Sequence, residues 1–336
     1  MFQAEYIYPK KVTHSNLDAA QALELSISLV EESFKQINIF NVDEEIQILA
    51  SKADNPRIKK TAASCTKGCT PLSHNKTKNY VIPDGKPCDF LIELGVMGED
   101  GKVFPKHYAK FRQINRYLEI VEDVFEFLPS ENTLRIIDFG CGKAYLTFAL
   151  YHYLKIIKNR NVEIIGLDLK KDVIDFCSRT AQKLNYTGLQ FLMGDIADYT
   201  NDHADMVVTL HACDTATDYA LINAVAWNTR VILSVPCCQH ELFSQIKNEL
   251  HQPMLKHGIL KDRLTEYLTD GLRALKLEAR GYDTALIEFT SLEHTARNIM
   301  IKAVKTNSSP AKMQKAQAQY EALRDFYNVK PTIEKL

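Results

Sequence analysis

The sequence lacks several features that would define its class at once. It has no apolar run as long as the roughly eighteen residues of a membrane-spanning helix. No basic patch followed by an apolar stretch opens the chain, so no secretory signal is expected. The eight cysteines are scattered and mostly lie in apolar segments, a pattern typical of reduced thiols rather than of a disulfide framework. We therefore expect a cytoplasmic protein without membrane association.

A strong net charge is also missing. The formal charge is −1, which gives no global bias toward nucleic acid. The local distribution is uneven, because residues 1–50 carry three basic and eight acidic side chains whereas residues 51–80 carry seven basic and one acidic. Such a basic segment suits contact with RNA phosphates, although a solvated loop has the same composition.

The first third of the chain has no regular alternation of elements. Helical spacing of apolar residues predicts a helix over 16–36, starting at Ser15 or Asn16, and a second over 43–53. The Lys-, Ser-, Thr- and Pro-rich stretch 54–80 indicates a loop, and the apolar run 88–96 a short strand. An amphipathic helix is expected over 106–128, where Pro129 ends it.

From residue 134 onward, strand and helix patterns alternate. Expected strands at 134–139, 162–167, 189–193, 206–210 and 230–235 are followed by helices through about 154 and over 172–184, 215–226 and 241–250. Two further strands, 284–290 and 298–304, are separated by too short a loop for a parallel crossover. This order predicts an α/β fold with a Rossmann-like, mostly parallel sheet and an antiparallel last strand.

This pattern also suggests three segments. They are an N-terminal, mainly helical extension (1–105) with the basic loop 51–80, a ligand-binding domain (106–307), and a C-terminal helix and tail (308–336).

A glycine turn follows the first strand of the alternating region. The sequence Asp138-Phe139-Gly140-Cys141-Gly142 lets the backbone turn sharply and approach a ligand. The third glycine of a dinucleotide fingerprint is replaced by the bulky Tyr145, and the acid ending the second strand, Asp168, comes later than that fingerprint requires. An acidic strand end instead suits a nucleoside that carries a cationic sulfonium and an amino acid head.

Acids end three consecutive strands, and the carboxyl ends of parallel strands meet at one crevice. Asp168 is placed to accept the ribose hydroxyls, Asp195 the adenine amine, and Ile196 can pack on the adenine ring. The full set of expected cofactor contacts is Asp138, Gly140, Gly142, Asp168, Leu169, Asp195, Ile196 and His211.

With these motifs, residues of about 130–305 resemble the class I S-adenosylmethionine (SAM) dependent methyltransferase superfamily. More narrowly, the stretches Lys110–Arg116, Leu210–Asp214 and Val235–His240 are similar to the methyltransferase-like protein 25 family. The resemblance implies SAM as cofactor and RNA as substrate class. The double cysteine before His240 also resembles a tRNA ribose methyltransferase family, except that Gln239 intervenes here.

The expected catalytic residues are His211, Asp214 and Cys237, at the ends of the fourth and fifth strands. His211 is the candidate base because imidazole titrates near neutral pH. Asp214 either orients His211 or caps the next helix. Cys237 is a packing residue, a nucleophile toward a pyrimidine, or a metal ligand with Cys213, Cys238 and His240. No metal site is expected, since Cys65, Cys69 and His74 lack the second cysteine pair of a zinc finger.

Two polar features of the chain bear on the acceptor. Arg112, Asn115 and Arg116 either grip RNA phosphate or form an ordinary polar helix face. The basic segment 51–80 favours RNA, either rRNA or tRNA, as the methyl acceptor. A protein methyltransferase and a non-catalytic SAM-binding module that recruits partners remain the alternatives.

Overall fold

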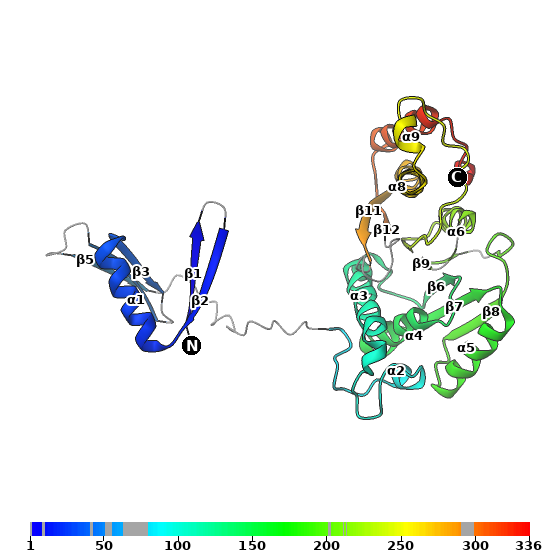
Figure 1. Cartoon of the computed structure of the whole chain (residues 1–336). Helices are drawn as coiled ribbons and strands as arrows, with labels where there is room; N and C mark the ends of the chain where they lie inside the picture. Colours follow the sequence, from blue (N-terminus) through cyan, green and yellow to red (C-terminus); the bar gives the residue numbers. More distant parts are fainter. Residues whose placement is uncertain are drawn as a thin grey trace. The chain divides into compact units, whose positions relative to one another are not determined.

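The computed structural model describes residues 2–8, 11–40, 43–50, 56–62, 80–200, 203–210, 212, 214–289 and 299–336. The chain divides into two compact units, unit 1 (Met1–Lys78) and unit 2 (Asn79–Leu336) (Figure 1). None of the helices in the described part of the chain combines the length and the apolar character that a membrane span needs.

Unit 2 is built on a seven-stranded sheet with the order β11-β12-β10-β9-β6-β7-β8. Its strand β12 runs antiparallel to both neighbours, and all other pairs between neighbours are parallel. This topology confirms the Rossmann-like sheet expected from the sequence. The strands are β6 (Leu134–Phe139), β7 (Val162–Asp168), β8 (Leu189–Met193), β9 (Met206–Thr209), β10 (Val231–Ser234), β11 (Tyr282–Glu288) and β12 (Ile299–Lys305).

Helices cover both faces of this sheet (Figure 1). Because successive side chains of a strand point to opposite faces, Ile136 packs into one hydrophobic core and Ile137 into the other. The first core is closed by α2 (Asp89–Glu93), α3 (Tyr108–Val124), α4 (Tyr145–Tyr151), the π-helix η3 (His152–Ile157) and α5 (Lys171–Lys183). The second is closed by α6 (Thr215–Ala226), α7 (Gln252–Leu255), α8 (Gly258–Ala279) and α9 (Pro310–Tyr327).

Unit 1 corrects the expectation of a mainly helical extension. Its described residues form the hairpin β1 (Phe2–Tyr8) and β2 (Lys11–Leu17), one helix, α1 (Ala19–Glu32), and the antiparallel sheet β3 (Gln36–Phe40), β4 (Glu44–Leu49) and β5 (Arg57–Ala62). The helix expected over 43–53 is strand β4, because Ile46 and Ile48 alternate with polar residues and β-branched side chains suit a sheet. The expected helix over 16–36 is confirmed, but its cap is Asp18 in a capping box with Gln21.

Residues 80–105 belong to unit 2. The boundary between the two units therefore comes after Lys78, earlier in the chain than the boundary at 105 that the sequence suggested. The apolar run 88–96 is the short helix α2 rather than a strand, and Phe90 and Leu91 in it are fully buried in the first core. A short apolar run that is buried on all sides has no periodicity that would distinguish a helix from a strand. The buried Asn115 side chain accepts a hydrogen bond from the Ile82 amide at 2.8 Å and holds this segment on α3.

The expected helix over 241–250 is also wrong, since this segment consists of turns. Long-range contacts compete with helix formation there, because the Glu241 carboxylate accepts hydrogen bonds from the Thr332 amide and hydroxyl at 2.9 and 2.6 Å. The 22-residue helix α8 was not expected, although Leu260, Leu264, Leu268 and Leu272 recur every four residues.

Candidate functional site

The glycine turn lies at the carboxyl end of β6, where the sheet offers its ligand-binding crevice. Gly140 and Gly142 have φ values of +68° and +52°, which favour residues without a side chain. Ala144, at φ +54°, adopts the same left-handed conformation just before α4. The turn therefore presents backbone rather than side chains to a ligand.

Asp168, at the end of β7, fixes the shape of this turn. Its two carboxylate oxygens accept hydrogen bonds from the backbone amides of Gly142 and Lys170, each at 3.0 Å. Each oxygen has further lone-pair positions, so the same carboxylate can also accept ligand hydroxyls. The sequence predicted Asp168 as a ligand contact, and its hold on the glycine turn is a second role that only the structure reveals.

Asp138 lies beneath the turn and is buried. Burial, reinforced by the nearby Asp168 carboxylate, raises the pKa of Asp138 to about 7, although a hydrogen bond from the Thr147 hydroxyl at 2.5 Å opposes the rise. A cationic ligand group would remove this penalty by pairing with the ionised carboxylate. Asp138 is therefore suited to an ammonium or sulfonium centre.

The end of β8 forms the opposite part of the crevice. Met193, at this strand end, and Leu169, directly after β7, expose 62% and 67% of their surface, which leaves apolar area that a planar base can cover. Asp195 accepts a hydrogen bond from the Ala197 amide at 2.9 Å, and Ile196 packs against the second core while Asn223 bonds its carbonyl. The three acids and Ile196 therefore all lie at the carboxyl ends of neighbouring strands, as the sequence indicated.

A cavity of about 220 Å³ adjoins the turn. It is lined by Lys110, Asp138, Gly140, Cys141, Lys143, Ala144, Tyr145, Leu146 and Leu210. Lys110, on α3, was not singled out as a ligand contact from the sequence. The available signal was a lysine at helical spacing with the core residues Ile114 and Tyr117.

The acceptor side of the crevice is only partly described. His211 and Cys213 lie outside the described residues, as do Cys65, Cys69 and His74. Cys237 and Cys238 follow β10 and are partly exposed, with 3.8 Å between their sulfur atoms.

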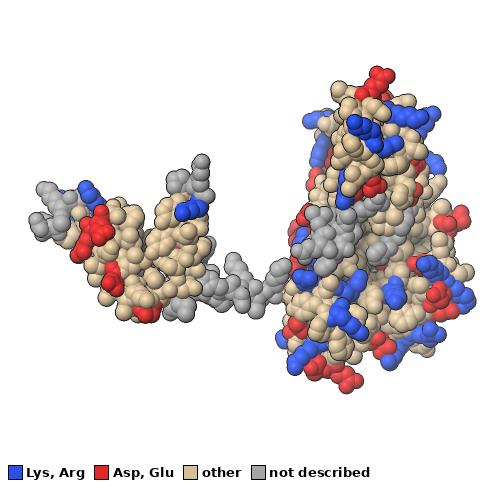
Figure 2. Space-filling view, viewed as in Figure 1, with Lys and Arg blue, Asp and Glu red and all other residues tan. Residues whose placement is uncertain are grey.

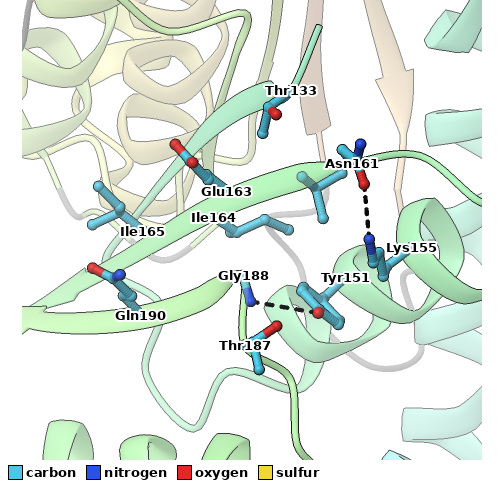
Figure 3. A pocket seen from close by; sticks show the side chains of 11 residues that line it. Thr133, Tyr151, Lys155, Asn161, Glu163, Ile164, Ile165, Thr187, Gly188 and Gln190 are labelled. Atoms are coloured by element: carbon cyan, nitrogen blue, oxygen red, sulfur yellow. Dashed lines mark hydrogen bonds between the residues drawn. The ribbon is translucent and has the colours of Figure 1, made fainter.

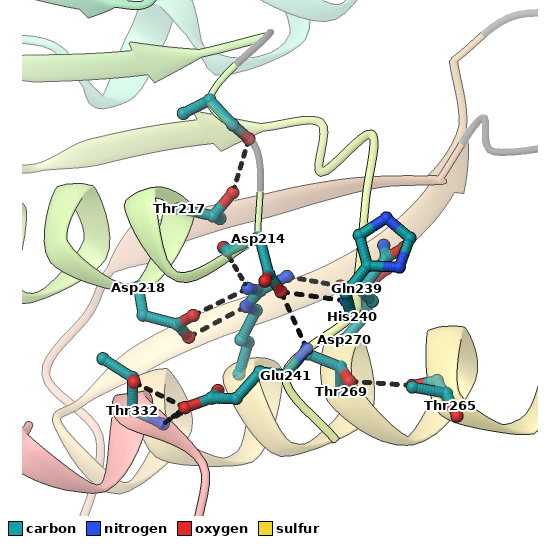
Figure 4. A network of polar contacts seen from close by, with 12 residues as sticks. Asp214, Thr217, Asp218, Gln239, His240, Glu241, Thr265, Thr269, Asp270 and Thr332 are labelled. Atoms are coloured by element: carbon teal, nitrogen blue, oxygen red, sulfur yellow. Dashed lines mark hydrogen bonds and ion pairs between the residues drawn. The ribbon is translucent and has the colours of Figure 1, made fainter. Parts of the chain in front are cut away.

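Asp214 joins the two loops that follow β9 and β10 (Figure 4). One of its carboxylate oxygens accepts hydrogen bonds from the His240 and Glu241 amides at 2.9 and 3.0 Å, and its own amide donates to the Cys238 carbonyl at 3.1 Å. Asp214 precedes α6, but its side chain makes no capping bond to that helix. The carboxylate thus positions the segment that carries Cys237 and Cys238.

A buried ion network supports the same loops from below (Figure 4). Arg273 of α8, fully buried, donates to both Asp218 carboxylate oxygens at 3.0 and 2.7 Å, to Asp270 at 3.0 Å and to the Asp214 carbonyl at 2.8 Å. Gln239 donates to Asp270 at 3.0 Å. Burial raises the pKa of Asp270 to about 6 against the opposing charge of Arg273. The loops that follow β9 and β10 are therefore anchored on α8.

Two other polar sites are distinct from this crevice. A cavity of about 320 Å³, lined by Thr133, Tyr151, Lys155, Gly188 and Gln190 among others, lies at the amino ends of β6, β7 and β8 (Figure 3). Open α/β sheets bind ligands at the other end of their strands.

The second is the cluster of Cys88, Asp89 and His152. The Cys88 sulfur is 3.8 Å from Nε2 of His152, whose Nδ1 contacts Asp89 and the Tyr186 hydroxyl at 3.1 Å each. Burial raises the pKa of the Cys88 thiol to about 12, so it stays protonated at neutral pH. This cluster ties α2 to η3.

Of the residues on α3 considered for RNA contact, Asn115 is buried and structural. Arg116 forms an ion pair with Glu119 at 3.1 Å on the exposed face.

Comparison with known proteins agrees with the geometry of the crevice. Residues 109–245 match a family model described as "Methyltransferase domain". No curated protein matches the chain.

Solved structures match the chain only at low similarity. A putative SAM-dependent methyltransferase from Methanococcus maripaludis is 17% identical (TM-score 0.36), over 63% of this chain and 99% of that one. An rRNA methylase from Streptococcus thermophilus is 13% identical (TM-score 0.37), over 58% and 98%. Coclaurine N-methyltransferase, bound to N-methylheliamine and SAH, is 12% identical (TM-score 0.28), over 36% of this chain and only 35% of its own length. Similarity at this level does not identify an acceptor.

Proposed function

We propose that RNA is the methyl acceptor of this chain, which is a class I SAM-dependent methyltransferase with SAM as its cofactor. When bound, SAM supplies an electrophilic methyl group on a sulfonium. The proposed cofactor contacts are those expected from the sequence, and the chemistry of those within the described residues supports them. Asp138 offers negative charge, Asp168 carboxylate acceptors, and Leu169 with Ile196 apolar surface for the base.

The acceptor proposal rests on one observation, the polar face of the β3-β4-β5 sheet in unit 1. Residues directly opposite one another in antiparallel strands share a face. The pairings Asn38–Gln47–Lys59 and Gln36–Leu49–Arg57 therefore lie on one side, together with Phe40, Glu45 and Thr61. The other side carries mostly isoleucine: Ile37, Ile39, Ile46, Ile48 and Ile58, with Lys60.

The composition of this polar face supports the proposal that it binds single-stranded RNA. Arg57 and Lys59 are exposed and can neutralise phosphates. The Gln47 amide donates to Asn38 at 3.2 Å, and Gln36 does the same, so the amides form a hydrogen-bonding row. Phe40 exposes 75% of its surface and offers a ring on which a base can stack.

Lys and Arg side chains are exposed at many places on the visible face of unit 2. Basic and acidic side chains are interspersed there (Figure 2).

Methyl transfer is an in-line displacement at carbon, so the chain's task is to align the acceptor and remove a proton where needed. We propose His211 as the base and Asp214 as a positioning residue. Cys237 stays a candidate nucleophile, held beside Cys238 by the Asp214 contacts. A His211→Ala variant that no longer transfers methyl at a SAM concentration that still saturates it would distinguish an enzyme from a SAM-binding module.

Salt-dependent RNA binding tests the acceptor proposal. We expect Arg57→Ala with Lys59→Ala to weaken binding of total tRNA or rRNA and to lower the slope of log affinity against log salt by about one to two. Lys60→Ala is the matched control, because Lys60 lies on the opposite face and pairs with Glu44 at 3.2 Å. Equal effects of the two changes would contradict the sheet-face proposal.

The acceptor itself is identified by transfer of labelled methyl from SAM to cellular RNA and to protein, followed by mass spectrometry of nucleosides. Label in protein alone would establish the protein methyltransferase alternative instead.

A further inference from the structure

The cavity beside the glycine turn contains both signs of charge. Asp138 and Lys110 line the same space of about 220 Å³, with the Tyr145 ring between the glycine loop and α3. The amino acid end of SAM carries an ammonium and a carboxylate on one carbon. Such a ligand binds in one orientation when the protein offers an anion for the ammonium and a cation for the carboxylate.

Asp138 determines how the ammonium and the carboxylate of the ligand are oriented in the cavity. A buried carboxylate repels the ligand carboxylate and attracts the ammonium. The ligand carboxylate must then meet a cation on another wall of the cavity. Two lysines line it, Lys110 and Lys143.

The surroundings of the two lysines differ. Lys143 is exposed to solvent, where water already stabilises its charge. Lys110 is half-buried, and burial lowers its pKa. Its contacts among the described residues are neutral: the Gln113 side-chain oxygen at 2.6 Å and the Tyr145 ring at 5.4 Å from the ammonium nitrogen. A partly desolvated ammonium with neutral partners gains most from an arriving carboxylate.

Lys110 is also held in place before a ligand arrives. It lies in the first turn of α3, directly before Phe111, which is fully buried in the first core with Ile114. Gln113, three residues further along the same helix, fixes the ammonium. Such preorganisation reduces the side-chain entropy that binding would otherwise cost.

We infer that Lys110 receives the carboxylate of the amino acid end of SAM and so makes the site specific for the carboxylated cofactor. This inference concerns the cofactor site and is independent of the RNA proposal. A competing role for Lys110, contact with an acceptor phosphate, is one outcome of the test.

The test compares two ligands that differ by one group. Calorimetry measures the affinity of the full chain for SAM and for decarboxylated SAM, which keeps the adenosine, sulfonium and amine. We expect the unmodified chain to prefer SAM by about tenfold or more, since a charge-assisted hydrogen bond is lost with the carboxylate. Lys110→Met should weaken SAM binding by the same factor and leave the affinity for decarboxylated SAM within about twofold.

Variants separate the possible explanations. Lys110→Arg keeps the charge and should retain most of the preference for SAM. Lys106→Met, on the short helix Pro105–His107 that precedes α3, is the control for a general charge effect and should leave both affinities unchanged.

The inference is overturned if Lys110→Met weakens both ligands equally, if Lys143→Met alone abolishes the preference, or if Lys110→Met lowers RNA affinity without affecting SAM. A thermal unfolding curve with the midpoint of the unmodified chain excludes misfolding of the variant.

Discussion

At the scale of a single residue, Asp138 combines a structural cost with its proposed role in binding SAM. Burial and the neighbouring Asp168 hold its pKa at about 7, whereas Thr147 opposes the rise through its hydrogen bond. The protonated form is the stable one in the empty site at acidic pH. A ligand ammonium requires the ionised form, so protonation of Asp138 and binding of SAM compete.

We therefore expect SAM affinity to rise with pH up to about 7 and then to level off. Below the pKa each pH unit costs up to tenfold in affinity, because a proton must leave Asp138 before the ammonium can pair with it. Calorimetry between pH 5.5 and 8.5, in buffers of different ionisation enthalpy, should detect proton release on binding at the acidic end. Asp138→Asn should bind weakly and without this pH dependence. A flat profile for the unmodified chain would contradict the role of Asp138.

Asp214 is a residue whose charge and hydrogen-bonding functions can be separated. The same oxygen accepts from the His240 and Glu241 amides, and an asparagine side-chain oxygen can do the same. We expect Asp214→Asn to keep kcat within about threefold and Asp214→Ala to lower it by about tenfold or more, because only the second leaves both amides without an acceptor. Equal losses of kcat in the two variants would instead assign a catalytic role to the charge. SAM affinity, measured in parallel, should not change in either.

At the scale of elements, α8 anchors the loops that follow β9 and β10. It contributes Arg273 and Asp270 to a fully buried network that also holds α6 through Asp218. Burial disfavours the Arg273 charge, but the two carboxylates outweigh it and hold the pKa of Arg273 above its ordinary value. A buried pair contributes little net stability when intact, yet losing one partner leaves uncompensated charge.

We expect Arg273→Met to lower the free energy of unfolding by about 3–5 kcal/mol in urea titrations, because Asp218 and Asp270 then remain buried without a cation. Adding Asp218→Asn and Asp270→Asn should restore part of this loss by removing the unpaired charges. A triple variant less stable than Arg273→Met alone would show that packing, rather than charge, determines the stability of this region.

At the scale of the whole molecule, the proposed contacts with cofactor and acceptor lie in different units. The crevice residues all lie in unit 2, whereas the polar face with Arg57 and Lys59 lies in unit 1. Among the described residues, unit 1 has a two-stranded and a three-stranded sheet, and its strands pair only with one another. Such a division allows the two activities to be separated by truncation.

We expect residues 79–336 alone to bind SAM as tightly as the full chain and to bind RNA about tenfold more weakly, because the phosphate contacts of unit 1 are lost. Calorimetry with SAM and filter binding with tRNA or rRNA at fixed salt measure the two affinities. Undiminished RNA binding by the truncated chain would place the acceptor surface in unit 2.

Local patterns were sufficient for most of the larger sheet. Strands β6 and β8 have the bounds expected from their apolar runs, and α6 has the bounds expected from its helical pattern. Apolar periodicity, β-branched residues and the polar, turn-forming residues that flank them define the bounds of these elements within a few neighbouring positions. The same patterns placed Asp138, Asp168 and Asp195 at strand ends, where parallel topology brings them to one crevice.

The remaining features depend on contacts between residues far apart in the chain. Sequence alone determined that a glycine turn and three strand-end acids lie at one end of the sheet, because strand direction and backbone freedom are local properties. The tertiary structure decided that Asp214 positions loops, that Arg273 of α8 supports them, and that Lys110 shares a cavity with Asp138. These depend on which side chains are desolvated together, and burial is a property of the packed chain that no single segment encodes.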